Sequence, residues 1–179
     1  MDAGVAAVAG AAIGALGAVG GGWLTVHGQS RQQRRQQQAE HRRWRDEVRR
    51  NAYNACLASA KELSAAWWKM SDRLWEEGST PDQWQARFVE AHDAWTRFST
   101  AVASVTVAGP RQVADAADAL RTAMYELDMA GLQWYEAARH EGHGRLDLFN
   151  SRFNKAATDK RIPDRAFQAA AREALGTED

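Results

Sequence analysis

The chain opens with 24 residues, Ala3 to Val26, that include no charged side chain, and a segment with eight arginines follows. At about 1.5 Å rise per residue, a helix over this stretch is roughly 36 Å long. A bilayer's hydrocarbon core is about 30 Å thick, and a helix satisfies its own backbone hydrogen bonds inside lipid. The pattern therefore predicts a single transmembrane helix over residues 1–28.

Alanine and glycine dominate this stretch, so its insertion into a bilayer is expected to be marginal. Two alternatives remain open: a flexible Gly/Ala tail, or a helix buried in an oligomer. A cleavable signal peptide is disfavoured because such a peptide begins with a positive region, whereas this chain has Asp2 there.

The charge distribution predicts an orientation for the span. Residues 31–50 hold eight arginines and three acidic residues, whereas residues 51–179 hold 15 basic and 19 acidic side chains. Arginine enrichment beside a span marks its cytoplasmic side, so we expect the N-terminus outside and the bulk of the chain in the cytoplasm. Trp23 is a candidate interface anchor. Residues 29–43 are expected to form a Gln/Arg-rich juxtamembrane helix whose arginines contact anionic lipids: Arg31, Arg34, Arg35, Arg42 and Arg43.

Four glycines recur along one face of the predicted span: Gly10, Gly14, Gly17 and Gly21. Small residues at this spacing let helix backbones approach closely in lipid. The stripe predicts a homo-oligomer formed through the transmembrane helix, although an Ala/Gly-rich composition also produces such spacings by chance.

Residues 44–175 repeat apolar side chains at alternating spacings of three and four, which is the heptad pattern of helices packed on helices. The predicted fold class is all-α, with the transmembrane helix followed by an antiparallel bundle of three long helices plus shorter C-terminal helices. We call each row of apolar residues along one helix face a seam. The first seam runs from Trp44 and Val48 through Ala52, Cys56, Ala60, Leu63, Trp67, Met70 and Leu74. The second is Trp84, Phe88, Ala91, Trp95, Phe98, Val102 and Val105. The third is Val113, Ala117, Leu120, Met124, Leu127, Gly131, Trp134 and Ala138.

Turn signals separate these seams. Thr80-Pro81-Asp82-Gln83 matches a helix start with a capping box, Gly109-Pro110 separates the second helix from the third, and a loop is expected at residues 142–144. Pro163 is expected to break the shorter C-terminal helices, and residues 176–179 are expected to fray. Gly131 in the third seam predicts close approach of a helix or a large ring.

The residue patterns indicate no catalytic, cofactor or metal site. His140-Glu141-Gly142-His143 lacks the two-residue spacing of the zinc-protease motif, and a solvated loop explains it better than a metal site with Asp147. Cys56 lies on an apolar face, as expected for a small buried hydrophobe. Trp68 and Trp75 fall just beside their seam, where they either widen the core or form an exposed patch.

The leading hypothesis is a membrane-anchored interaction or scaffold protein with a cytoplasmic, coiled-coil-like bundle and an unknown protein partner. One alternative is a membrane-active effector or small pore assembled through the glycine stripe. Another is a soluble basic helix that binds nucleic acid. This last reading is weaker because the aromatic residues lie in the seams and do not interleave with the arginines.

Overall fold

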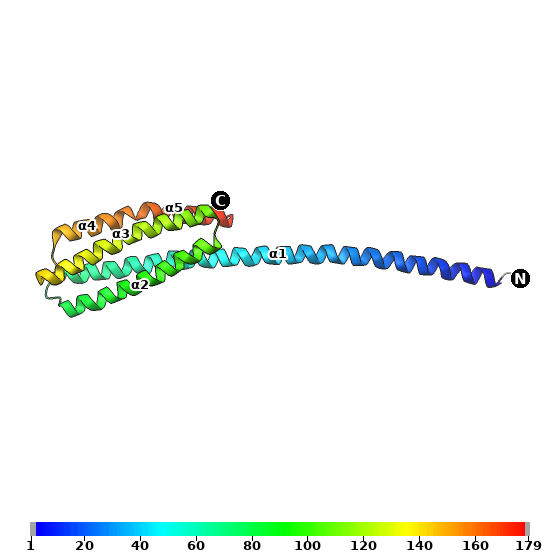
Figure 1. Ribbon diagram of the computed structural model, residues 1–179, viewed down its shortest axis with the longest axis horizontal. Coiled ribbons are helices and arrows are strands. Elements are labelled where there is room, and N and C mark those ends of the chain that lie inside the picture. Colours follow the sequence, from blue (N-terminus) through cyan, green and yellow to red (C-terminus); the bar gives the residue numbers. More distant parts are fainter. Residues whose placement is uncertain (1–2, 178–179) are drawn as a thin grey trace. The chain divides into compact units, whose positions relative to one another are not determined.

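The computed structural model describes the backbone of residues 3–177 and the side chains of residues 36–177. These residues form five helices and no strand: α1 (Ala3–Trp75), α2 (Pro81–Ala108), α3 (Arg111–Glu141), α4 (Asp147–Asp159) and α5 (Arg161–Leu175) (Figure 1). The predicted all-helical class is therefore confirmed.

The chain divides into two units, Met1–Arg45 and Asp46–Asp179. In the part of the chain whose side chains are described, none of the helices combines the length and apolar character that crossing a membrane requires. The predicted span at residues 1–28 lies outside that part, as do Gly10, Gly14, Gly17, Gly21 and Trp23.

Residues 46–75 of α1 pack with α2 to α5 in an antiparallel helical bundle. Glu62 of α1 contacts Arg97 of α2, whereas Arg49, earlier in α1, contacts Ala108 at the later end of α2. Rising residue numbers on α1 thus match falling numbers on α2, so the two helices are antiparallel. Short connections between consecutive helices favour this arrangement.

Helices α4 and α5 together form the fourth member of the bundle. Lys160 alone separates them, and both pack against α3. Trp68 of α1 meets Phe153 of α4 edge to face, and Tyr53, earlier in α1, meets Phe167 of α5 in the same way. This fourth member therefore also runs antiparallel to α1.

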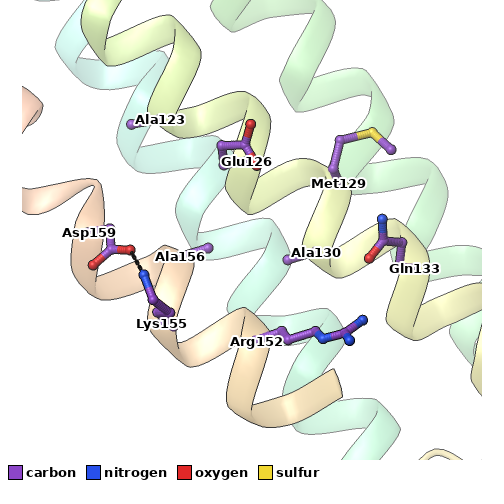
Figure 2. Close-up of a pocket in the computed structure, with 9 residues that line it drawn as sticks. All are labelled: Ala123, Glu126, Met129, Ala130, Gln133, Arg152, Lys155, Ala156 and Asp159. Atoms are coloured by element: carbon purple, nitrogen blue, oxygen red, sulfur yellow. Dashed lines mark hydrogen bonds and ion pairs between the residues drawn. The ribbon is translucent and has the colours of Figure 1, made fainter. Parts of the chain in front are cut away.

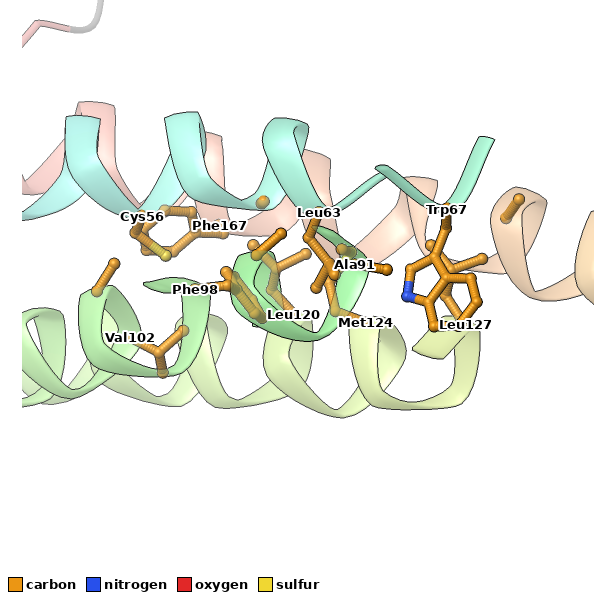
Figure 3. Packing of buried hydrophobic residues seen from close by; sticks show 14 of the residues in the cluster. Cys56, Leu63, Trp67, Ala91, Phe98, Val102, Leu120, Met124, Leu127 and Phe167 are labelled. Carbon is orange, nitrogen blue, oxygen red and sulfur yellow. The ribbon is translucent and has the colours of Figure 1, made fainter. Parts of the chain in front are cut away.

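The heptad seams form the core, as the sequence predicted for most of their length. Every residue of the third seam is buried, and the first seam is buried from Ala52 to Leu74. Figure 3 shows side chains from α1, α2, α3 and α5 meeting in this core. The seam on α2 is buried except at Phe88 and Trp95, which are half-buried and still contact the core. Burial of this continuous apolar surface is the main stabilising contribution to the bundle.

The first two residues of the α1 seam are not part of this core. Trp44 is 58% exposed and Val48 is 38% exposed, which corrects the expectation that both pack inside. At the level of Val48, α2 has reached its last turn at Ala108, because the neighbouring Arg49 donates from Nε to the Ala108 carbonyl oxygen at 3.1 Å. The α1 seam therefore continues past the end of α2, and α2 does not cover Val48.

Local signals fix most helix ends as predicted. The Gln83 side chain accepts a hydrogen bond from the Thr80 backbone N–H at 3.1 Å, and Pro81 opens α2. Gly142 ends α3 in the left-handed conformation with φ +75°, which glycine adopts without steric cost.

Pro163 does not break the C-terminal helices, contrary to expectation. The break lies at Lys160, and Pro163 is in the first turn of α5. The first backbone N–H groups of a helix have no partner within that helix, so a proline there costs no hydrogen bond.

Two glycines allow close approaches between α1 and its neighbours. A Cβ on Gly131 of α3 would overlap the Trp67 ring, which confirms the prediction of a large facing side chain. A Cβ on Gly144 would overlap the Leu74 backbone carbonyl. The Gly144 carbonyl also accepts a hydrogen bond from the buried Trp134 indole at 2.8 Å, so the α3–α4 connection is fixed on the end of α1.

Candidate interaction surface

Only two of the residues predicted to act at the membrane have described side chains. Arg42 and Arg43 are exposed on α1, with all side chains from 36 to 43 likewise exposed. Arg31, Arg34 and Arg35 lie outside the residues whose side chains are described.

The bundle itself carries an open apolar surface that sequence reasoning did not single out. Val107 near the end of α2 is 89% exposed, and Val48 faces solvent on α1. Between them runs a groove of about 580 Å³. Its α1 wall is Val48, Ala52 and Ala55, and its α2 wall is Thr100, Ala103, Ser104, Val107 and Ala108. We call these eight residues the α1–α2 groove.

The composition of the α1–α2 groove suits a helix better than a small polar ligand. None of its eight lining residues is charged, and most have side chains no larger than threonine. Small side chains let a second backbone approach closely, whereas the two valines supply apolar area at one end. Amphipathic helices bind grooves of this kind through apolar residues at helical spacing.

One polar contact lies at the Ala108 end of the groove, and another lies beyond its opposite end. At one end Arg49 donates to the Ala108 carbonyl. Toward the middle of the bundle, Arg97 Nε lies 3.3 Å from Glu62 Oε2, with both side chains more than half exposed. Glu62 is 14 residues after Val48, which corresponds to about 21 Å along a helix. The groove itself ends at Ala55 on α1, seven residues after Val48, so it offers a bound helix about two turns of contact surface.

The hydroxyls near the groove are used by their own helices. Ser104 Oγ donates to the Thr100 carbonyl at 3.1 Å, and Thr100 Oγ1 donates to the Thr96 carbonyl at 3.0 Å. Ser59, next along the α1 side, donates to the Ala55 carbonyl at 2.8 Å. These bonds occupy the donors of all three hydroxyls. The groove therefore presents methyl and methylene groups more than free donors.

A second groove, of about 410 Å³, lies between α3 and α4 and has a different character. Figure 2 shows charged side chains along it, including the ion pair of Lys155 with Asp159. Arg152 and Glu126 also line it. Charges of both signs on exposed helices are typical of a solvated surface, so we assign no ligand to this groove.

Trp68 and Trp75 both widen the core and remain partly exposed, which are the two possibilities that the sequence left open. Trp68 is 42% exposed and Trp75 is 38% exposed. Their rings also meet buried rings edge to face, Trp68 with Phe153 and Trp75 with Trp134, at centroid distances of 5.2 and 6.3 Å. Both tryptophans therefore extend the core at its edge and remain partly exposed.

Asp128 is a carboxylate with a raised pKa, and the role of its Oδ1 atom is structural. Asp128 Oδ1 accepts a hydrogen bond at 2.8 Å from the indole N–H of Trp67. Burial raises the pKa of Asp128, while the Trp67 hydrogen bond and the nearby His92 partly offset that rise. Because Trp67 is buried, its N–H needs a partner, and Asp128 supplies it.

Two kinds of site, a cysteine nucleophile and a metal-binding cluster, are not evident among the described residues. Cys56 is fully buried, and burial raises the pKa of its thiol to about 12, so the thiol is protonated at neutral pH. Within the described part of the chain, no group of three His, Cys, Asp or Glu side chains is placed to hold a metal ion. His140 and His143 are exposed at the end of α3.

Comparisons with known proteins add no assignment: no protein family, no curated protein and no solved structure matches this chain. The α1–α2 groove must therefore be interpreted from its own residues. One sequence signal could have located it, because Ala103, Ser104 and Val107 lie beside the α2 seam and widen its apolar face.

Proposed function

We propose that this protein is a single-pass membrane protein with its N-terminus outside, and that its cytoplasmic bundle acts as an interaction module. The observation that carries the proposal is the uncharged stretch Ala3–Val26, which is followed directly by the arginine-rich segment 31–50. Arginines beside a span favour the cytoplasmic side and attract anionic headgroups.

The bundle supports an interaction role through the α1–α2 groove. An exposed apolar surface bordered by polar residues is typical of a binding site for another protein. We therefore propose that the groove binds a helix of a partner protein.

Membrane fractionation tests the first half of this proposal. The full-length chain should remain in the membrane pellet after washing with high salt or alkaline carbonate, and detergent should release it. Recovery in the soluble fraction after a salt wash would refute the span. It would leave only electrostatic attachment through arginines such as Arg42 and Arg43.

A matched pair of variants connects that result to the span. The double variant Ile13→Arg and Leu16→Arg adds two charges to the predicted span, each opposing insertion by about 2.5–3.5 kcal/mol at its centre. This variant should move to the soluble fraction. Ile162→Arg, at a position that is 77% exposed on α5, adds charge outside the span and should stay in the membrane.

A further inference from the structure

Aromatic side chains line the contact between α2 and α3. The α2 residues are four and three positions apart, which places them on one helix face: Phe88, His92 and Trp95. The α3 residues follow the same spacing: Tyr125, Asp128, Leu132 and Tyr135. Phe88 stacks on Tyr135 at a centroid distance of 4.6 Å, and Trp95 meets Tyr125 at 5.9 Å. The two sets of side chains therefore face each other along antiparallel helices, and we call them the aromatic row.

Asp128 lies between the two ring pairs of the aromatic row. It follows Tyr125 by three residues on the same face of α3. His92 is close enough for its charge to lower the pKa of Asp128. The buried Trp67 reaches Asp128 Oδ1 from the core, with its indole N–H at 2.8 Å. The outer side of the row is open to solvent, because Tyr125 is 45% exposed and Asp128 itself is half-buried.

Asp128 has no cationic partner within residues 36–177. None of the ion pairs in this part of the chain includes it. Trp67 uses only the Oδ1 atom, which leaves Oδ2 without a donor among the same residues. A half-buried charge without a partner is costly to the fold. A carboxylate in this situation is a candidate binding group for a cation.

The surroundings of Asp128 also favour a cation. The faces of tryptophan and tyrosine rings attract guanidinium groups, and Arg139 already lies over the Tyr135 ring, with Cζ 5.7 Å from the centroid. Residues 51–179 hold 15 basic and 19 acidic side chains, so the bundle attracts a basic partner. A planar guanidinium can stack on a ring and donate to a carboxylate at once, which a compact ammonium cannot do equally well.

We propose that Trp95, Tyr125 and Asp128 form a binding site for an arginine side chain of a partner protein. The guanidinium stacks on the exposed Tyr125 ring and donates to Asp128 Oδ2, while Trp67 keeps its bond to Oδ1. The site lies on the α2–α3 face and needs only the fold of the bundle. It therefore depends neither on the predicted span nor on the α1–α2 groove.

Titration with a capped arginine tests the site in the full-length chain in mild detergent. The probe is N-acetylarginine amide, and the readout is the indole N–H resonances in proton–nitrogen NMR spectra, assigned from single Trp→Phe variants. We expect saturable shifts of the Trp67 and Trp95 resonances in the millimolar range. The Trp134 resonance should not move, because its N–H donates to the Gly144 carbonyl. No saturable shift of Trp67 and Trp95 would overturn the proposal.

Ligand analogues test the chemistry and the source of the bound group. N-acetylcitrulline amide has nearly the same shape without the charge and should not bind. N-acetyllysine amide should bind at least about threefold more weakly, because it lacks the planar group. Equal binding by either analogue would overturn the assignment to guanidinium. Free L-arginine should bind no more tightly than the capped form, and tighter binding would assign the site to the amino acid in place of a protein.

Matched charge removals on α3 test the role of Asp128. Asp128→Asn keeps an acceptor for Trp67 but should weaken binding of the capped arginine at least about tenfold. Glu126→Gln removes a charge from an exposed position two residues away, on the wall of the groove between α3 and α4. It should leave the affinity unchanged. An equal loss in both variants would show that only net charge matters and would overturn the site.

Substitutions of Tyr125 test the ring contact. Tyr125→Leu removes the aromatic face and should weaken binding about threefold or more. Tyr125→Phe restores the ring without the hydroxyl and should recover most of that loss. Circular dichroism melting curves should show that both variants fold, because Tyr125 is partly exposed. Equal affinities of the two folded variants would contradict stacking on this ring.

Discussion

Gly131→Ala should destabilise the bundle, although alanine is ordinarily the better helix former. In a helix interior this change contributes about 1 kcal/mol of stabilisation. Here the new Cβ would overlap the Trp67 ring, which is only 2% exposed. Phe88 meets that ring edge to face at 6.4 Å, and Asp128 accepts a hydrogen bond from its N–H at 2.8 Å. The ring therefore cannot move without losing contacts.

The opposing contributions determine the size of the effect. Overpacking a core costs about 1–3 kcal/mol, and losing a hydrogen bond to a charged group costs about 1.5–3 kcal/mol. After subtracting the helix-propensity gain, we expect a net loss of about 1.5–5 kcal/mol. Urea unfolding of the full-length chain in mild detergent, followed by circular dichroism, measures this loss directly.

A double-mutant cycle shows whether the overlap is the cause. Trp67→Ala alone should cost about 3–5 kcal/mol because it leaves a cavity. In that background Gly131→Ala has room for its methyl group, so it should stabilise by about 1 kcal/mol instead. A stabilising effect of Gly131→Ala in the wild-type chain would refute the close contact, and so would an equal loss in both backgrounds.

Three further changes test other contacts of the bundle. Burial raises the pKa of Asp128, so the folded state binds a proton more tightly than the unfolded state, and stability should fall as pH rises through the interval between the two pKa values. Asp128→Asn keeps an acceptor for the Trp67 indole N–H but removes the charge. Urea titrations at several pH values should show a higher free energy of unfolding at pH 7 and no such pH dependence. An unchanged pH profile would contradict this. Tyr53→Phe removes a buried hydroxyl that has no hydrogen-bond partner among residues 36–177, and thermal melts should show it neutral or more stable by about 1–3 kcal/mol, whereas a clear loss would indicate a bound water. Gly144→Ala would place its Cβ on the Leu74 backbone carbonyl, which cannot rotate away, so hydrogen exchange should increase in the α3–α4 connection; unchanged exchange there would count against the contact.

Patterns local to one helix were predictable from the sequence. The heptad spacing identified every buried residue of α3 except Tyr135, because the other buried positions follow from the helical period alone. Gly131 was identifiable because it occupies a position that otherwise carries a large apolar side chain. The capping interaction of Thr80 with Gln83 depends on residues only three apart, so it too could be recognised without knowledge of the fold.

Features that depend on the lateral arrangement of helices were not predictable. The exposure of Val48 depends on where α2 ends beside α1, and seam spacing within α1 contains no information about that. The break at Lys160 could not be distinguished from one at Pro163, because proline is compatible with both a helix end and a first turn. The α1–α2 groove likewise depends on which residues beside two different seams come to lie at one level.

In the proposed topology, Ala3–Val26 crosses the membrane and the bundle lies in the cytoplasm. Protease treatment of sealed spheroplasts, or of cells with an equivalent exposed outer face, tests it most directly on a chain tagged at both termini. We expect loss of the N-terminal tag and protection of the C-terminal tag until detergent is added. Protection of both tags, with the chain extractable by salt, would contradict this topology.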